Sequence, residues 1–536
     1  MMDVRLLLAS PAQGPGTAED DALPEALPLP TEIIDMIAES LSLADLQNVR
    51  LACREFNGRF TGQEFVGYFR DRVTDLSTSS LERLEAVASH PKFQPIVRRL
   101  KVVAVIYDTL TTELHLLDVR ARMNYAGQEG RPGRRLAVQV LTTTEARLRW
   151  LQSMLEMQCQ QAEDGYSALI HRLAAIMKKL GGLQCLDLVS AVVAGEDLGA
   201  PGRIVYKDGS QGFWHQLLPR RAAEVLHITT AAVIQSKARL LSLSLYATQR
   251  GGCIEAAGVA SVLSRLNVEE LAAALASVGE LNLTFSPRIR PSSPEKDEYH
   301  LMGPSASIEA QASAYNVSRL SGGYIPPDLL MGVTDDNFDG IVALLRLMPQ
   351  LQTLDLHMFN KLQDGNSEVY DSILFDIAQK VCFPQLTTLT LRGMRATTAS
   401  LMQFIESPAK LRHLELRYVC LGSGTWASIL PHLTKVGKLE FLRLSNLFDR
   451  RLVNLAPKDD AAMAEEMPTW ATDDQLRTTT SFPCANGPCI HTREFGPDVL
   501  AKGLEFTSKE RGTHLPTAML KSWLEARLDE FGRSLS

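Results

Sequence analysis

The chain has 536 residues with a formal net charge of −7, and 45% of them are hydrophobic while 22% are charged. These are the values of a globular protein, and the length is too great for one compact core. The acidic balance argues against a general nucleic-acid-binding protein, which usually presents a basic face.

The sequence also argues against membrane insertion and secretion. No stretch approaches the roughly eighteen consecutive apolar residues of a membrane span, and the apolar run at Leu6–Leu8 is too short for a signal-peptide core. The eight scattered cysteines do not form a disulfide framework in a chain of this length. We therefore expect reduced thiols in a cytoplasmic or nuclear protein.

Two short amphipathic helices are predicted after residues 1–27, which lack apolar periodicity and are expected to be disordered. Thr31 is a good N-cap for the first helix, and a second helix should begin at about Ala44. Apolar residues recur every three or four positions in both helices, so each has one apolar face. Because so short a pair can hardly bury both faces alone, it needs the rest of the chain or a partner.

These residues carry a resemblance to a known family. Leu29-Pro30-x-Glu32-Ile33-x-x-x-Ile37, followed by Leu41, Asp45-Leu46, Val49, Cys53-Arg54 and Phe56, resembles an F-box over roughly residues 28–65. The text after it, LERLEAVASHPKFQPIVRRLKV, resembles the extension found in fungal F-box proteins with leucine-rich repeats. Periodicity alone shows only two helices, and a helical hairpin packed on its own domain is the alternative.

The resemblance implies docking onto the Skp adaptor of a cullin–RING ubiquitin ligase. The residues that it implies for adaptor binding are Leu29, Pro30, Ile33, Ile34, Ile37, Leu41, Leu46, Val49, Cys53 and Phe56. After the F-box, Ser79 or Ser80 is expected to cap a helix that stops before Pro91.

A second pattern, Leu-x-x-Leu-x-Leu with Val at some of the leucine positions, occurs eight times along the chain. The copies begin at Val97, Leu183, Leu240, Val278, Leu351, Leu386, Leu411 and Leu439. Its apolar positions alternate as in a strand that faces one core, and the last four copies lie roughly 25–35 residues apart, close to the leucine-rich-repeat period. Predicted helices begin near Asn337, Ser400 and Thr425; the first has an apolar stripe of Ile341, Leu344, Leu345 and Met348.

The predicted fold is therefore an α+β repeat structure: N-terminal F-box helices followed by an irregular leucine-rich-repeat α/β solenoid. We expect irregularity because the repeat usually carries Asn or Cys three positions after its third Leu. This chain has Phe359, Met394, Val419 and Leu447 there. The predicted domains are residues 1–27 (disordered segment), 28–70 (F-box), 71–455 (solenoid with inserted helices and loops) and 456–536 (linker and capping helix).

Several segments interrupt the repeat. Residues 118–135 are basic and Gly-rich and are expected to form a mobile loop, whereas 143–180 predict two long helices. Residues 286–326 predict a long exposed loop, in which Ser286 and Ser293, each before Pro, are candidate phosphorylation sites. An amphipathic helix from Thr517 is expected to cap the last repeat.

The sequence contains no motif of a hydrolase, a nucleotide-binding loop or a zinc protease, so we predict no catalytic residues and no cofactor. Cys484, Cys489 and His491 would need His514 to complete a zinc site; we prefer free cysteines in a loop and predict no metal. His357 and His413 take outward strand positions and are interpreted as polar surface.

Together these features predict a non-catalytic substrate-recognition subunit of a ubiquitin ligase complex. Its expected partners are the Skp adaptor with the cullin–RING ligase and an unidentified protein substrate, but no nucleic acid and no membrane. The alternative is a non-catalytic scaffold acting outside the ligase. An enzyme with its site on an insertion loop is a weaker reading, because the motifs are missing.

Overall fold

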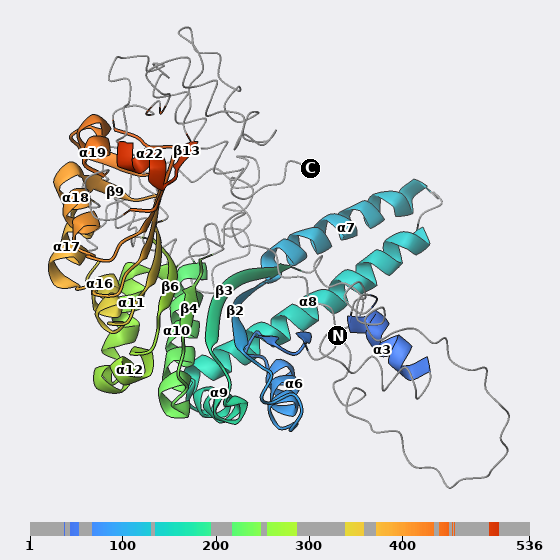
Figure 1. The fold of residues 1–536 in the computed structure, drawn as a ribbon. Coiled ribbons are helices and arrows are strands. Elements are labelled where there is room, and N and C mark those ends of the chain that lie inside the picture. The colour runs from blue at the N-terminus through green and yellow to red at the C-terminus, as the bar shows by residue number, and fades with distance from the viewer. Residues whose placement is uncertain are drawn as a thin grey trace. The chain divides into compact units, whose positions relative to one another are not determined.

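The computed structural model describes residues 37, 43–52, 67–129, 134–194, 217–247, 254–286, 338–358, 371–433, 439–449, 453, 455 and 492–502. Over these ranges the chain is a mixed α/β protein with mostly parallel strands (Figure 1). It divides into two compact units. The first contains residues 1–188, 193–207 and 228–240, and the second contains 189–192, 208–227 and 241–536.

The first unit contains β1 (Asp71–Thr74), β2 (Arg99–Asp108) and most of β3 (Cys185–Ala194), in that order, with β1 parallel to β2. Helix α6 (Thr78–Ala88) packs on β1 and on α9 (Ser167–Leu180). The cap of α6 is Ser77, whose side chain accepts from the Ser80 amide, rather than Ser79 or Ser80. Asp75 accepts hydrogen bonds from the amide and hydroxyl of Ser77, at 3.0 and 2.7 Å, which holds the cap in place.

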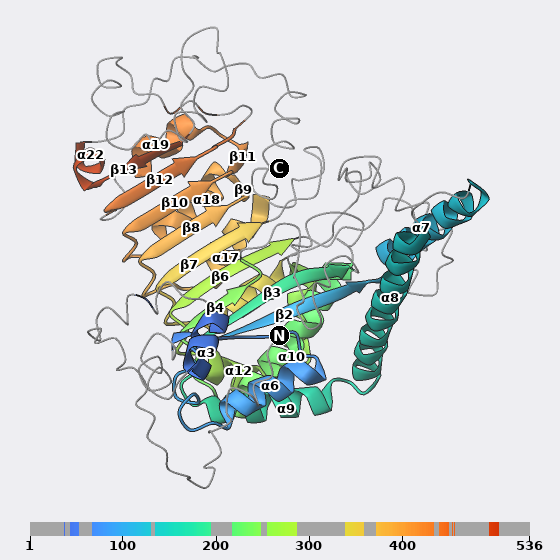
Figure 2. The ribbon, with the colours of Figure 1, turned by 90° about the vertical axis from the view of Figure 1, so that its right-hand side faces the viewer.

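Two antiparallel helices, α7 (Thr109–Glu129) and α8 (Arg134–Glu163), pack along each other in the first unit (Figure 2). The prediction of a mobile loop over residues 118–135 is therefore wrong for its described part. Val119 is buried in this packing, and Arg120 pairs with Glu145 at 2.8 Å, so tertiary contacts override the Gly-rich composition. The prediction of two helices within residues 143–180 is confirmed, although α8 begins earlier.

The second unit is built on a strand array (Figure 2). Its order is β4 (Ser242–Leu245), β6 (Glu280–Ser286), β7 (Thr353–Met358), β8 (Thr388–Arg392), β10 (His413–Arg417), β12 (Phe441–Ser445) and β13 (Thr492–Phe495). Only β13 is antiparallel to its neighbour, and the short β5 (Ile254–Glu255) pairs with β6. All eight copies of Leu-x-x-Leu-x-Leu in the chain form strands, as predicted.

Leucines line one face of the array in register. Leu281, Leu354, Leu389, Leu414 and Leu442 occupy matching positions on neighbouring strands, and each is 0% exposed. Because strand side chains alternate between faces, every second residue joins this core. Burial of each leucine stabilises the fold by about 1.5–3 kcal/mol.

Helices cover the leucine face (Figure 1). They are α11 (Ala256–Ser264), α12 (Val268–Leu275), α16 (Asp339–Arg346), α17 (Ile373–Lys380), α18 (Thr398–Glu406) and α19 (Trp426–Leu433). The predicted stripe of Ile341, Leu344, Leu345 and Met348 is buried, which confirms the helix near Asn337. Helix α10 (Leu217–Ser236), which contributes residues to both units, was not predicted.

The turns after the strands carry apolar residues where a leucine-rich repeat usually has Asn or Cys. Neighbouring turns are joined by a second set of backbone hydrogen bonds. Met394, Val419 and Leu447 are each 0% exposed, and each follows a residue with positive φ. Strands β9 (Arg395–Thr397) and β11 (Cys420–Ser423) pair in parallel, and the Cys420 amide donates to the Met394 carbonyl at 2.9 Å. Apolar side chains can occupy these positions because neighbouring turns satisfy each other's backbone groups. Phe359 lies outside the described residues.

The C-terminal end of the array was not predicted. Strand β13 and the helix after it, α22 (Pro497–Lys502), fall in the range interpreted as a linker. The predicted disordered segment 1–27, the capping helix from Thr517 and Ser293 lie outside the described residues. Ser286 ends β6 and is 0% exposed, so the prediction of an exposed loop is wrong at this residue. None of the described helices is long and apolar enough to cross a membrane.

Candidate functional sites

Few of the predicted adaptor-binding residues belong to the described part of the chain. Helix α3 (Leu43–Ala52) carries Leu46, which is 0% exposed, and Val49, which is half-buried. Ile37 has a helical backbone and is 37% exposed. The remaining residues, Leu29, Pro30, Ile33, Ile34, Leu41, Cys53 and Phe56, lie outside the described residues.

The exposed fractions of the side chains show which residues near α3 a partner could contact. Leu46 is buried within the chain's own packing, so in this structure its side chain is not available to a partner. Leu51, which was not predicted, is 80% exposed and is the most exposed large apolar side chain described in α3. It falls outside the apolar stripe of α3, so helical periodicity offered no signal for it.

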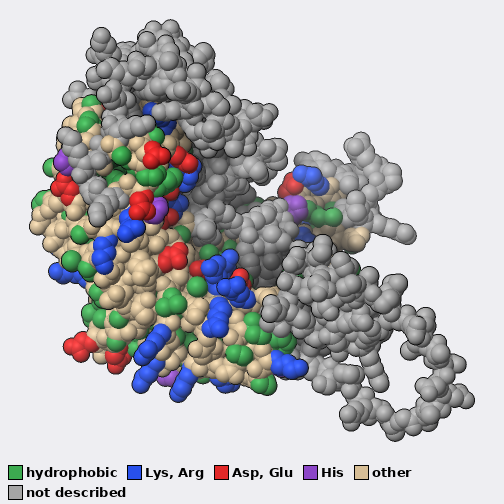
Figure 3. Space-filling view, viewed as in Figure 1, with side chains coloured by type: hydrophobic (Ala, Val, Ile, Leu, Met, Phe, Trp, Pro, Cys, Tyr) green, Lys and Arg blue, Asp and Glu red, His purple; other side chains and the backbone are tan. Residues whose placement is uncertain are grey.

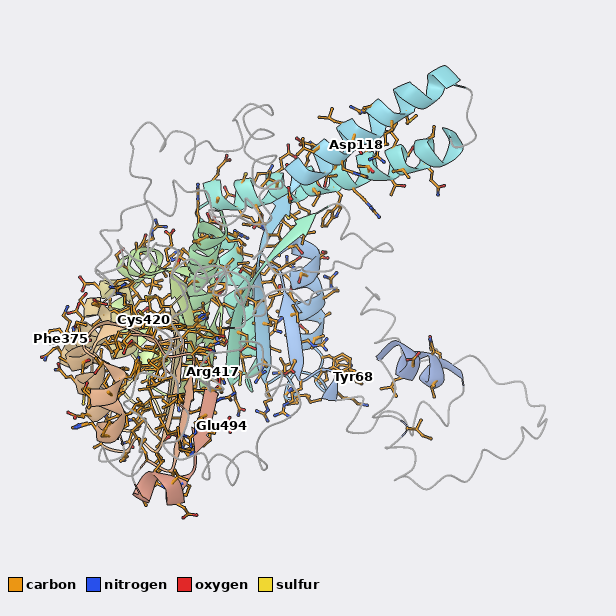
Figure 4. The ribbon with its side chains drawn as sticks, turned by 90° about the horizontal axis from the view of Figure 1, so that it is seen from above. Tyr68, Asp118, Phe375, Arg417, Cys420 and Glu494 are labelled. Atoms are coloured by element: carbon orange, nitrogen blue, oxygen red, sulfur yellow. The ribbon has the colours of Figure 1, made fainter. Side chains whose placement is uncertain are left out.

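A second candidate site is the face of the strand array opposite the leucines, here called the polar face. Two rows of side chains cross its strands in register. One row is Asn282, Asp355, Thr390, Glu415, Arg443 and Glu494, and the other is Thr284, His357, Arg392, Arg417, Ser445 and Thr492. In Figure 4, Arg417 and Glu494 lie on the side of the strands away from Phe375 of α17.

Charged side chains of the polar face form ion pairs between strands. The Nε and Nη2 atoms of Arg392 donate to the two carboxylate oxygens of Asp355 at 2.9 and 2.8 Å. Burial raises the pKa of Asp355 above its usual range, against the opposing effect of the Arg392 guanidinium. This bidentate contact fixes both side chains in one orientation.

Glu415 anchors the second group of charges. It accepts from Nε of Arg417 and lies 3.2 Å from Nε of Arg443, which in turn lies 3.2 Å from Glu494. Figure 3 shows acidic and basic side chains gathered over this part of the second unit. The alternating signs make this a network rather than a set of isolated surface pairs.

His357 belongs to the same face but is half-buried. Its Nδ1 lies 3.2 Å from Oγ1 of Thr284, and burial, with a smaller effect from Arg392, lowers the pKa of His357 to about 3. The imidazole is therefore neutral at physiological pH. The interpretation as exposed polar surface is confirmed for His413, which is exposed, but is wrong for His357.

The neutral state of His357 should make stability depend on pH. Because the imidazole pKa is near 6.5 in the unfolded chain but about 3 in the fold, the unfolded state binds the extra proton between these values. The free energy of unfolding should fall as pH drops from about 6.5 toward 3, by at most about 1.4 kcal/mol per pH unit from this residue.

We expect His357→Gln, which keeps a side chain able to bond Thr284, to flatten this slope. Urea denaturation of both proteins from pH 4 to 7 measures it, and the difference isolates the imidazole because the other groups are shared. Equal slopes in the two proteins would contradict the assignment.

The described residues contain no group of three or more His, Cys, Asp or Glu side chains arranged to hold a metal ion. Cys484, Cys489, His491 and His514 lie outside them. The chain matches no protein-family model, and no curated protein matches it. The polar face is suited to recognition, because it offers paired charges on a broad surface of regular spacing.

Proposed function

We propose that this chain is an F-box substrate receptor of a ubiquitin ligase. In this proposal residues 28–65, including α3, dock on the Skp adaptor of a cullin–RING ligase. The strand array is an irregular leucine-rich-repeat solenoid whose polar face recruits a protein for ubiquitination. The observation that supports it most is the conjunction of the motif at residues 29–56 with eight Leu-x-x-Leu-x-Leu strands.

The proposed mechanism needs no active site in this chain. Holding a substrate beside the transfer machinery of the ligase raises its effective concentration there. The array suits this role because side chains on successive strands, about 4.8 Å apart, can contact one partner at many points. The proposed location is the cytoplasm, the nucleus or both.

Adaptor capture tests the proposal. The double variant Ile37→Asp with Leu51→Asp should lose co-purification with a co-expressed Skp adaptor, because both side chains are exposed and apolar. An interface hot spot contributes about 2 kcal/mol or more, so the affinity should fall at least about thirtyfold. Leu46→Ala would be less informative, because truncating a buried leucine also disturbs the fold.

A matched control is Leu117→Asp on α7, which is also apolar and 52% exposed but lies outside the F-box motif. It should leave capture unchanged. Undiminished capture of the double variant, with its circular dichroism spectrum intact, would reject the F-box assignment.

A further inference from the structure

Two arginines lie directly opposite each other on the polar face. Arg392 of β8 and Arg417 of β10 are register partners, so two like charges stand on adjacent strands. Such a pair is destabilising unless opposite charges compensate it. Asp355 and Glu415 supply this compensation, each binding one arginine.

The two guanidinium groups differ in how much of their donor capacity they use. Arg392 directs both Nε and Nη2 at Asp355, whereas Arg417 gives only Nε to Glu415. Among the described residues the two Nη groups of Arg417 have no hydrogen-bond partner, and its side chain is 27% exposed. A guanidinium carries five N–H donors, placed so that two of them can bind one carboxylate. The Nη1 and Nη2 atoms of Arg417 therefore remain available to a ligand, and they are called its free edge here.

We infer that the free edge of Arg417, with Arg392 beside it, binds the carboxylate of an Asp or Glu side chain in an acidic segment of a protein partner. The site itself rests on the geometry of the polar face; only the identification of this partner as a ubiquitination substrate rests on the proposed function.

The charges around the two arginines favour a carboxylate over a phosphate. The two rows of the polar face hold three arginines, Arg392, Arg417 and Arg443, against three carboxylates, Asp355, Glu415 and Glu494. A phosphate group carries close to two negative charges and would be repelled by Glu415 and Asp355 more strongly than a singly charged carboxylate. The site therefore favours a singly charged carboxylate over a phosphate.

The clean variant is Arg417→Ala. Glu415 keeps Arg443 as its partner at 3.2 Å, so the substitution leaves no buried carboxylate unpaired. Arg392→Ala would instead leave Asp355 without its guanidinium. The matched control is Arg412→Ala, since Arg412 precedes the same strand and pairs with Glu440 at 2.8 Å, but its side chain is 57% exposed and belongs to neither row.

The test uses the purified full chain and a fluorescein-labelled peptide of alternating Glu and Gly. Fluorescence anisotropy should show binding that weakens about tenfold in Arg417→Ala, as expected for loss of a charged hydrogen bond, and less in Arg417→Lys. Arg412→Ala should bind like the wild type, and the matching Gln peptide should not bind. A phosphoserine version of the peptide should bind no more tightly than the Glu peptide.

Absence of binding to the wild-type chain, equal affinity in Arg417→Ala, or an equal loss in Arg412→Ala would overturn the inference. Tighter binding of the phosphoserine peptide would overturn the choice of carboxylate. Melting temperatures identify any variant that fails to fold. If Arg417→Ala fails to fold, Arg417→Lys, which keeps the charge, is compared with the wild type instead, and equal affinity of these two proteins would overturn the inference. Because adaptor capture is measured separately, either proposal can fail while the other stands.

Discussion

Leu414→Asp is expected to unfold the strand array, whereas His413→Ala, at the adjacent residue, should hardly change the melting temperature. Leu414 is 0% exposed and lies in register between Leu389 and Leu442, so an Asp there places an unpaired charge within the leucine ladder. Loss of the leucine alone costs about 2–5 kcal/mol. The added cost of the buried charge makes the total comparable with the stability of a whole domain.

The paired substitutions test the two-residue period directly. His413 is exposed on the opposite face, where truncation removes little more than a ring contact with Phe441. Thermal denaturation followed by circular dichroism measures both variants. Similar destabilisation by the two changes would show that the faces are assigned incorrectly.

Gly340→Ala should also destabilise the second unit strongly. This is expected even though alanine is more favourable than glycine inside a helix by about 1 kcal/mol. Helix α16 packs closely on α11 at this position. An added Cβ on Gly340 would lie 2.5 Å from the Ala260 nitrogen and 2.6 Å from the Ala256 oxygen. Since both are backbone atoms, the helices must separate, and overpacking of this kind costs about 1–3 kcal/mol or more.

Gly279→Ala is the matched control for this substitution. Its Cβ would meet nothing closer than 3.9 Å, so we expect a change within about 0.5 kcal/mol. Urea denaturation of both variants compares them. If Gly340→Ala proved as stable as the wild type, the close approach of α11 and α16 would be incorrect.

The eight strands and the helices near Asn337, Ser400 and Thr425 could be predicted because each depends on periodicity within one short segment. Strand β13 could not, since its four residues acquire their role only by pairing with β12, which is distant in the sequence. Helix α7 was missed because its packing on α8 outweighs a composition typical of loops.

The contacts of the polar face could not be predicted from local periodicity either. Alternation predicts that His357 and His413 point outward, but only the observed surroundings show that the first is half-buried and the second exposed. The pairing of Asp355 with Arg392 joins residues 37 positions apart. It depends on the register of two strands, which spacing within either motif does not specify. In α3, periodicity separates the buried Leu46, which lies on the apolar stripe, from the exposed Leu51, which lies off it, but it does not show which of the two a partner can reach.

The position of β13 in the sequence affects how the protein folds during its synthesis. Ser445 and Thr492, which face each other across β12 and β13, are 47 residues apart, so the ribosome must add that length before the final strand exists. At roughly 5–20 residues per second this takes roughly 2–10 s. During that interval the outer edge of β12 has no strand to pair with, and unpaired edges promote association with other chains. During this interval the nascent protein should therefore be prone to aggregation and should depend on chaperones.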